Sequence, residues 1–202
     1  MLDVDEIKFD SDGLVPCVMQ DARTGEVLTL AYMNEEALRL TRETGEIHFW
    51  SRSRNELWHK GATSGNTMKV RALRIDCDDD AIVALVDPSG PACHTGERSC
   101  FHAGDLEPQT GEALAVLERT IAERRAAGDG GSSYTAQLLA DPPFIGEKVR
   151  EEAEEVTRAA REESDQRVRE EAADVLYHLA VLLASRNMSY GDAFDELNAR
   201  RR

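Results

Sequence analysis

His102-Ala103-Gly104-Asp105-Leu106-Glu107-Pro108-Gln109-Thr110-Gly111 separates two stretches of different character in this chain of 202 residues. The segment contains two glycines, a proline and no periodic apolar pattern, which is typical of a linker. Before it, short apolar runs alternate with turn signals; after it, apolar residues recur at helical spacing. We therefore expect two domains, at 1–105 and 112–202, joined by a linker at 106–111.

The first domain is predicted to be mainly β with one helix, an α+β fold. Residues 14–20 and 27–32 are rich in apolar residues and flank the turn signal Asp21-Ala22-Arg23-Thr24-Gly25, so they predict a hairpin. Asn34 is a favourable N-cap and Gly45 a favourable C′ residue, and these delimit the helix. Further strands are expected at 47–51, 68–76 and 81–86.

The second domain is predicted to be entirely helical. Leu114, Leu117 and Ile121 form one apolar stripe, and the glycine- and serine-rich run 128–133 ends that helix. Ser189 and Asp192 resemble a capping box. The remaining helices are expected at about 134–139, 144–161 and 165–187, with a last one after Ser189.

Composition and charge exclude several classes of partner. The net charge of −15 repels nucleic acid and anionic membranes, so we expect neither as a partner. No run approaches the roughly 18 apolar residues of a membrane span, and the acidic N-terminus lacks the regions of a signal peptide. Four cysteines do not make a disulfide framework in a chain of this size. We therefore expect a soluble cytoplasmic protein.

Cys77, Cys93 and Cys100 have the spacing C-x15-C-x6-C and could hold one zinc ion. Structural zinc normally has four protein ligands, whereas catalytic zinc keeps one position open. Three thiolates therefore suggest zinc that does chemistry. His94 could be a fourth ligand, a general base or a surface residue, and we favour the base because its pKa range suits proton transfer. His102 is another possible fourth ligand, and Cys17 a more distant one.

Asp76, Asp78 and Asp80 alternate around Cys77, so an extended segment would place them on one face with the thiol on the other. The aspartate face could hold a hard cation, or it could be an acidic strand edge that discourages aggregation. The basic and polar stretch 51–66 contrasts with the acidic chain. It could bind phosphate or form a plain hairpin with a charged face.

Two acidic runs, 151–155 and 170–174, lie about equally far from the predicted turn near residue 162. Each is roughly nine residues from it, or about 14 Å along a helix. In an antiparallel hairpin the two runs would face each other, and their carboxylates would repel unless cations lay between them. Mg²⁺ or Mn²⁺ suits such an oxygen-rich site. The alternative is a solvated face with many salt bridges.

Several motifs resemble those of two enzyme families. Residues 9–101 resemble phosphoribosyl-AMP cyclohydrolase through Leu30-Ala31-Tyr32-Met33-Asn34, Ser51-Arg52-Ser53-Arg54, Leu57-Trp58-His59-Lys60-Gly61, Asp76-Cys77-Asp78 and Ala92-Cys93-His94-Thr95-Gly96. From about residue 114, the chain resembles phosphoribosyl-ATP pyrophosphohydrolase, a MazG-like all-α family, through Ser133-Tyr134-Thr135, Lys148, the two acidic runs and Ala173-Asp174-Val175-Leu176-Tyr177-His178. The order resembles the bifunctional enzymes of histidine biosynthesis.

This resemblance implies that the second half hydrolyses phosphoribosyl-ATP to phosphoribosyl-AMP and pyrophosphate. The first half would then open the adenine ring between N1 and C6. It also implies a homodimer in which both subunits supply cysteines to Zn²⁺, with Mg²⁺ bound by Asp76, Asp78 and Asp80 and by Glu151, Glu152, Glu155, Glu170, Glu171 and Asp174. The residues expected to bind substrate are Ser51, Arg52, Ser53, Arg54, Trp58, Lys60, Ser64, Gly65, Asn66, Lys148 and His178.

Two other functions fit parts of the pattern. A zinc-stabilised β domain could be tethered to an acidic helical dimerisation module without any catalysis, and zinc would then have four protein ligands. Alternatively, the helical half could hydrolyse ordinary nucleoside triphosphates. A panel of substrates tested on the purified chain distinguishes these functions.

Overall fold

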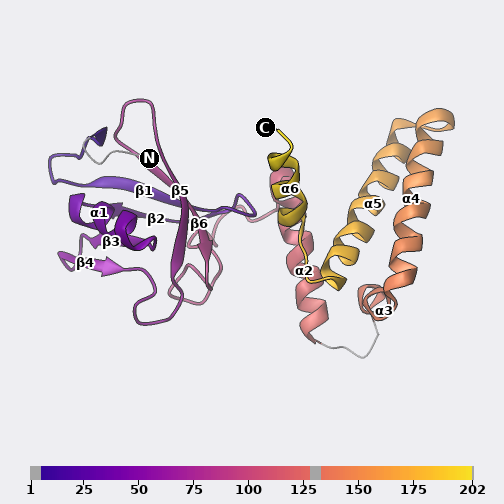
Figure 1. The fold of residues 1–202 in the computed structure, drawn as a ribbon, viewed down its shortest axis with the longest axis horizontal. Coiled ribbons are helices and arrows are strands. Elements are labelled where there is room, and N and C mark those ends of the chain that lie inside the picture. The colour runs from indigo at the N-terminus through magenta and orange to yellow at the C-terminus, as the bar shows by residue number, and fades with distance from the viewer. Residues whose placement is uncertain (1–5, 128–132, 202) are drawn as a thin grey trace. The chain divides into compact units, whose positions relative to one another are not determined.

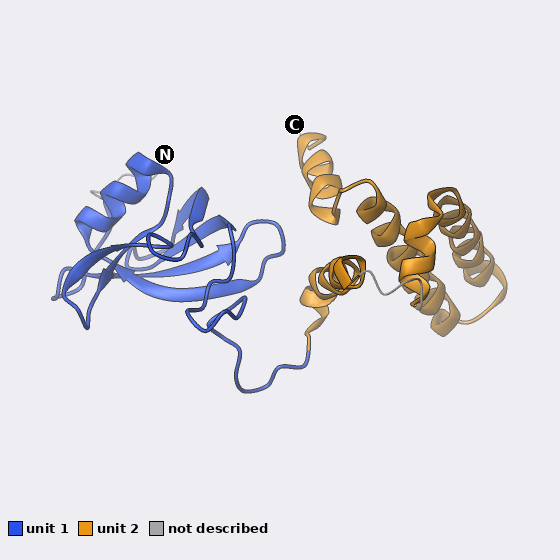
Figure 2. Cartoon of the chain, turned by 90° about the horizontal axis from the view of Figure 1, so that it is seen from below, with its two compact units in different colours: residues 1–107 blue, residues 108–202 orange. Residues whose placement is uncertain are grey.

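The computed structural model describes residues 6–127 and 133–201. The acidic N-terminal segment and most of the predicted helix break at 128–133 lie outside the described residues. The chain divides into two compact units, unit 1 (residues 1–107) and unit 2 (residues 108–202), shown in Figures 1 and 2. Each unit has a hydrophobic core of its own.

Unit 1 is built on a six-stranded sheet with the strand order β4-β3-β2-β1-β6-β5. The strands are β1 (Val15–Asp21), β2 (Val27–Met33), β3 (His48–Ser51), β4 (Glu56–His59), β5 (Met68–Ile75) and β6 (Ile82–Pro88). Only the β1–β6 pair is parallel; the other neighbouring strands are antiparallel. Burial alternates along β1, as expected for a strand with one face in the core.

One helix, α1 (Glu35–Thr44), accompanies the sheet and has the predicted caps. The side chain of Asn34 accepts a hydrogen bond of 2.8 Å from the N–H of Ala37. Gly45 ends the helix in the left-handed conformation, with φ 72°, and donates its N–H to Thr41. These features confirm the predicted mainly β fold with one helix.

Strand β4 was not among the individually expected strands, although a hairpin was one interpretation of the stretch 51–66. Glu56–His59 pairs with β3, and Asn55 adopts a positive φ of 53° in the turn between them. The stretch 51–66 therefore begins as a hairpin with a charged face. This backbone arrangement does not exclude phosphate binding, because the arginines remain exposed.

Unit 2 is helical, as predicted. A short 3₁₀ turn, η2 (Thr110–Glu112), precedes α2 (Ala113–Ala127), α3 (Tyr134–Ala140), α4 (Pro142–Glu162), α5 (Asp165–Ser185) and α6 (Tyr190–Ala199). Helices α4 and α5 form an antiparallel hairpin that turns at Glu163 and Ser164 (Figure 1). Helix α4 begins two residues before its predicted start, because proline is well tolerated in the first helical turn.

No helix in the described part of the chain, residues 6–127 and 133–201, is long and apolar enough to cross a membrane.

Gly61 and Gly65 lie in one loop and provide a matched test of the packing there. Both have positive φ, 88° and 78°. A Cβ on Gly61 would lie 2.4 Å from backbone atoms of Asn66 and Thr67, whereas a Cβ on Gly65 would meet nothing within 4 Å. Gly65→Ala should cost about 1–2 kcal/mol of left-handed strain. Gly61→Ala should cost about 1–3 kcal/mol more, because the backbone must also move.

Urea denaturation followed by tryptophan fluorescence measures this difference. Both tryptophans of the chain, Trp50 and Trp58, lie in unit 1, so the signal reports the unfolding of that unit. Equal losses of unfolding free energy in the two variants would contradict the close approach at Gly61.

Candidate functional site

Strand β6 separates two groups of candidate metal ligands in unit 1. Cys77 and the three aspartates lie in the hairpin turn before β6, and Cys93 and Cys100 lie in the loop after it. The strand has seven residues and spans roughly 20 Å. Within one chain, the three predicted zinc ligands are therefore not brought together.

Cys93 and Cys100 belong to the same loop, and Cys100 lies close enough to contribute to the lowered pKa of Cys93. The Thr95 hydroxyl donates to Cys93 Sγ at 3.1 Å. This bond, with contributions from the Thr95 backbone, His102 and Cys100, lowers the pKa of Cys93 to about 6. The thiolate therefore dominates at neutral pH, and soft thiolates of this kind suit zinc.

His94 and His102 lie equally close to this thiol. His94 Nδ1 and His102 Nε2 are each 3.8 Å from Cys93 Sγ, and both side chains are exposed. The geometry is compatible with either residue as a ligand or a base. Cys17 is different, because its thiol is fully buried in β1 and burial raises its pKa to about 12. Its burial therefore argues against Cys17 as the fourth ligand.

A cleft of about 510 Å³ opens beside the two cysteines. Lys60 is buried at its wall. Desolvation lowers the pKa of Lys60, and the charges of Cys100 and Cys93 oppose this shift, so the ammonium lies near both thiols. Six of the predicted site residues other than the cysteines line the cleft: Arg54, Trp58, Lys60, Ser64, Asn66 and His94.

A second pocket, of about 480 Å³, shares several wall residues with this cleft. Ser51, Arg52, Ser53 and Arg54 line it, so the predicted phosphate-binding motif borders a cavity. The guanidinium of Arg52 lies 3.8 Å from the centre of the Tyr32 ring. Gly65 belongs to the loop beside the cleft and lines neither of these two pockets.

Asp76, Asp78 and Asp80 gather in the β5–β6 turn. One carboxylate oxygen of each lies within 4.8 Å of the others. The negative charge of Asp78 raises the pKa of Asp80. Asp76 accepts hydrogen bonds from the backbone N–H groups of Asp80 and Ala81. A hard cation would relieve the repulsion between these exposed carboxylates.

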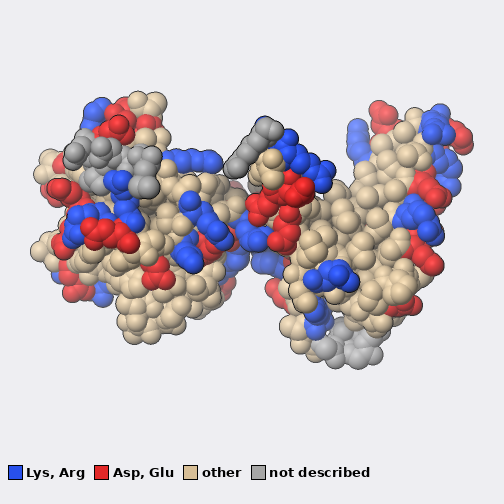
Figure 3. All heavy atoms as spheres, in the orientation of Figure 1, with Lys and Arg blue, Asp and Glu red and all other residues tan. Residues whose placement is uncertain are grey.

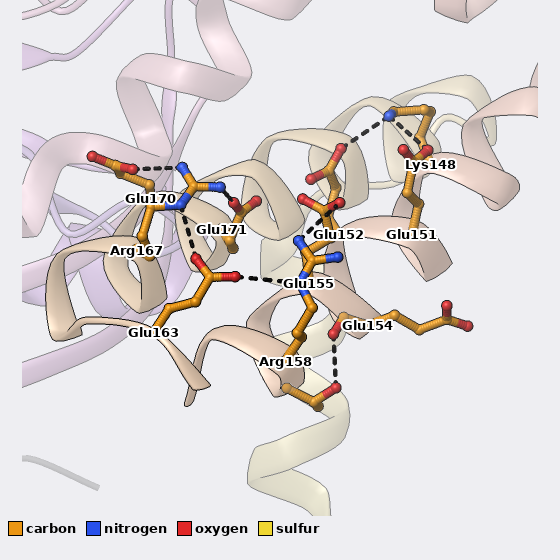
Figure 4. A network of polar contacts seen from close by, with 11 residues as sticks. Lys148, Glu151, Glu152, Glu154, Glu155, Arg158, Glu163, Arg167, Glu170 and Glu171 are labelled. Carbon is orange, nitrogen blue, oxygen red and sulfur yellow. Dashed lines mark hydrogen bonds and ion pairs between the residues drawn. The ribbon is translucent and has the colours of Figure 1, made fainter. Parts of the chain in front are cut away.

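In unit 2, the helical hairpin brings Glu152, Glu155 and Glu171 together, with ligand oxygens within 4.8 Å of one another (Figure 4). Glu152 and Glu171 are buried. Asp174 is exposed and lies outside this carboxylate cluster. Two further predicted ligands pair elsewhere: Glu151 accepts from Lys148, and Glu170 accepts from Gln166 and Arg167.

Each member of the carboxylate cluster also has a basic partner. Lys148 Nζ lies 3.1 Å from Glu152 Oε1, Arg158 Nη2 lies 3.4 Å from Glu155 Oε1, and Arg167 contacts Glu171. Hydrogen bonding to Glu151 and Glu152 raises the pKa of Lys148. The salt bridges expected of a solvated face are thus present. They surround the three neighbouring carboxylates of Glu152, Glu155 and Glu171.

His178 lies behind the cluster and is only 4% exposed. Its Nδ1 is 2.9 Å from the Asp174 carbonyl oxygen and 3.7 Å from Glu152 Oε1. Its Nε2 is 3.2 Å from the Tyr134 hydroxyl. These contacts support Glu152 from the interior of the unit.

Sequence reasoning did not identify several residues that shape the two sites. Thr95 and Arg158 had a local signal, because Thr95 lies two positions after Cys93 and Arg158 lies three after Glu155. Phe49, which lines the cleft, and Arg98, which bonds to Asp21, had none. Their partners lie far away in sequence, so only the fold reveals them.

Comparison with known proteins assigns each unit to a family. Residues 29–102 match the family model for phosphoribosyl-AMP cyclohydrolase, and residues 114–201 match that for phosphoribosyl-ATP pyrophosphohydrolase. The chain is 48% identical over 203 residues to the histidine biosynthesis bifunctional protein HisIE of Bacillus subtilis (strain 168), covering 99% of the chain and 97% of the relative.

Two further relatives carry the same name and span nearly the whole chain. The protein of Gloeobacter violaceus is 50% identical over 200 residues, with 96% of the chain and 90% of the relative covered. That of Thermus thermophilus is 46% identical over 203 residues, with 100% and 95% covered.

The Thr95–Cys93 hydrogen bond predicts a change in thiol reactivity. In zinc-free protein, alkylation of Cys93 should reach half its maximal rate near pH 6. Thr95→Val removes the hydroxyl donor, so the thiolate is less stabilised and the midpoint should move to higher pH. The backbone contribution of Thr95 remains, so the shift should be partial. Mass spectrometry of the Cys93 peptide across a pH series measures it.

Thr63→Val is the matched control, because Thr63 lines the same cleft without a described bond to Cys93. It should leave the midpoint unchanged. The same midpoint in Thr95→Val and in the unmodified protein would remove Thr95 from the stabilisation of this thiolate.

Proposed function

Since the chain belongs to the bifunctional proteins of histidine biosynthesis, which join a phosphoribosyl-AMP cyclohydrolase to a phosphoribosyl-ATP pyrophosphohydrolase, we infer that each unit performs one of these reactions. Unit 2 hydrolyses phosphoribosyl-ATP to phosphoribosyl-AMP and pyrophosphate, and unit 1 then opens the adenine ring between N1 and C6. The observation that supports this division is chemical: the neighbouring thiols Cys93 and Cys100 lie in unit 1, whereas the carboxylate cluster of unit 2 has no cysteine beside it, because all four cysteines of the chain lie in unit 1. The match to two enzyme families argues against a non-catalytic dimerisation module.

In unit 1, the proposed zinc ligands are Cys93 and Cys100 of one subunit and Cys77 of a second. The support is the length of β6, which keeps Cys77 away from the other two thiols of its own chain. Zinc bound there supplies a Lewis acid that lowers the pKa of water, as hydrolytic ring opening requires. A homodimer with shared sites would bring Cys77 of one subunit to Cys93 and Cys100 of the other. The three aspartates around Cys77 are the proposed Mg²⁺ ligands.

The cleft residues of unit 1 have complementary tasks. His94 adjoins the thiols and is exposed, so it can take up and release the proton of the attacking water. Arg52 and Arg54 provide cations for phosphate groups. Trp58 offers an aromatic face in the cleft for the base. Lys60 holds a positive charge against the thiolates and the substrate.

In unit 2, the proposed Mg²⁺ ligands are Glu152, Glu155, Glu171 and Asp174. Mg²⁺ bound there neutralises the triphosphate and activates water. Lys148 is paired with Glu151 and Glu152. A metal ion on Glu152 would release Lys148 from that carboxylate, and its ammonium could then contact phosphate oxygens. His178 keeps Glu152 in place from the buried side.

The proposed homodimer also has support in unit 2. Figure 3 shows few charged side chains over α5, while charged side chains follow the outer edge of α4. Leu176 of α5 is 42% exposed, which suits contact with a second copy. Zinc-binding thiols must stay reduced, so we propose the cytoplasm as the compartment. We also propose that 1–105 and 112–202 act as separate domains linked by 106–111, since the two cores share no residue.

Mixed dimers test the shared zinc site. Cys77→Ser and Cys93→Ser should each abolish ring opening and leave pyrophosphate release intact. In a heterodimer of the two variants, one site combines an intact Cys77 with an intact Cys93–Cys100 pair. The unseparated co-expressed mixture should therefore regain about a quarter of the ring-opening activity, since about half of the dimers are mixed and one of their two sites is complete. Heterodimer purified through two different affinity tags should regain about half.

The control for this experiment is Cys77→Ser mixed with itself, which should remain inactive. An inactive heterodimer of Cys77→Ser and Cys93→Ser would show that the two cysteines do not complement each other across subunits.

Glu155→Gln tests the carboxylate cluster and the division of labour together. It keeps the size of the side chain and removes a hard metal ligand, so pyrophosphate release should fall by orders of magnitude while ring opening persists. Melting curves without Mg²⁺ should show equal or higher stability, because a carboxylate among others is removed. Glu154→Gln, next to it but outside the cluster, should change neither activity. Retained pyrophosphate release in Glu155→Gln would rule out this site.

A further inference from the structure

Arg98 lies in the loop that carries the two thiols. The backbone of this loop folds back on itself: the N–H of Ala92 donates to the Arg98 carbonyl oxygen at 3.0 Å, and the N–H of Cys93 donates to that of Glu97 at 3.0 Å. The N–H of Cys100 donates to the Leu28 carbonyl oxygen of β2 at 2.8 Å. The main chain of Arg98 is therefore paired with the residue that precedes Cys93.

The side chain of Arg98 extends to the β1–β2 turn and binds two carboxylates there. Its Nη2 donates to Asp21 Oδ2 at 2.6 Å, and its Nε donates to Glu26 Oε2 at 2.8 Å. The Thr24 hydroxyl also donates to Glu26 Oε2, at 2.9 Å. Asp21 and Glu26 are 77 and 72 positions away from Arg98. One guanidinium thus joins the thiol loop to the sheet by charge-assisted bonds.

The two carboxylates that accept hydrogen bonds from Arg98 are themselves held in place. Asp21 Oδ1 accepts hydrogen bonds from the N–H groups of Arg23 and Thr24, at 2.8 and 3.1 Å. The side chains of Asp21 and Glu26 are only 6% and 15% exposed. Loss of the Arg98 guanidinium would remove a charge-assisted partner from each of two largely buried acids, and the loop would lose its side-chain anchor.

We propose that Arg98 is a positioning residue that holds Cys93 and Cys100 in the arrangement in which they bind zinc. The inference rests on the proposed zinc site and adds a residue that touches neither metal nor substrate. A zinc site with few ligands from each subunit gains affinity when those ligands are held in place before binding, because less loop motion must be lost. Arg98 provides this restraint through Asp21 and Glu26.

The test compares zinc affinity in the full chain. Zinc-free protein is titrated against a chromophoric chelator, and the Co²⁺-substituted protein is examined by absorption spectroscopy. Arg98→Met should weaken zinc binding by roughly 10- to 100-fold, as supporting residues of metal sites commonly do. Its thiolate–Co²⁺ bands should shift. Arg98→Lys, which retains the charge but not the two-nitrogen geometry, should recover part of the affinity.

Arg71→Met is the matched control. Arg71 pairs with Asp87 between β5 and β6, so the variant loses an arginine–aspartate contact of the same unit outside the thiol loop. It should bind zinc and Co²⁺ as the unmodified protein does. Wild-type affinity and spectrum in Arg98→Met would overturn the proposal, as would an equal loss in Arg71→Met.

If Arg98→Met does not fold, Glu26→Gln removes one carboxylate arm and leaves Asp21 in place. Weaker zinc binding by folded Glu26→Gln supports the proposal, and unchanged binding overturns it. Failure of the unmodified protein to bind zinc is a separate outcome, because it removes the zinc site itself rather than the role of Arg98.

Discussion

The stiffness of one seven-residue strand, β6, determines which chemical groups of unit 1 can meet. A paired strand cannot fold back on itself, so the turn with Cys77 and the loop with Cys93 stay at opposite ends. The sheet builds two incomplete groups of ligands instead of one complete group. In the proposed site, a second copy of the chain would bring the complementary group to each. Assembly is thus a requirement of the proposed zinc chemistry rather than an addition to it.

Unit 2 meets a different constraint, the repulsion between carboxylates on facing helices. Glu152, Glu155 and Glu171 would be unfavourable neighbours without positive charge nearby. The hairpin supplies that charge from Lys148, Arg158 and Arg167. A metal ion that binds these carboxylates must displace the basic side chains. The ion pairs therefore lower the net affinity of the cluster for a metal ion. In the proposed site, internal neutralisation and metal binding would be alternative states of this cluster.

Local patterns in the sequence predicted a large part of the fold, because caps and periodicity act over a few residues. Asn34 and Gly45 delimited α1 correctly, and the acidic runs faced each other as their spacing from the turn required. Long-range geometry was not predictable in this way. The spacing of the three cysteines did not reveal whether one chain could bring them together; only the family resemblance implied a site shared between subunits, and the length of β6 gives a physical reason for it. The partners of Arg98 were likewise invisible, since nothing near position 98 marks Asp21 as its neighbour.

The separate cores of the two units have a consequence for how mutations in the gene complement one another. Because no core residue is shared, a substitution that loosens the packing around Phe49 need not disturb the helices around Ile121. Mutations that disrupt the packing of one unit should therefore fall into two groups that complement one another, each blocking one of the two reactions. Mapped along the reading frame, these mutations would mark two functional units, with a boundary at the loop after Phe101.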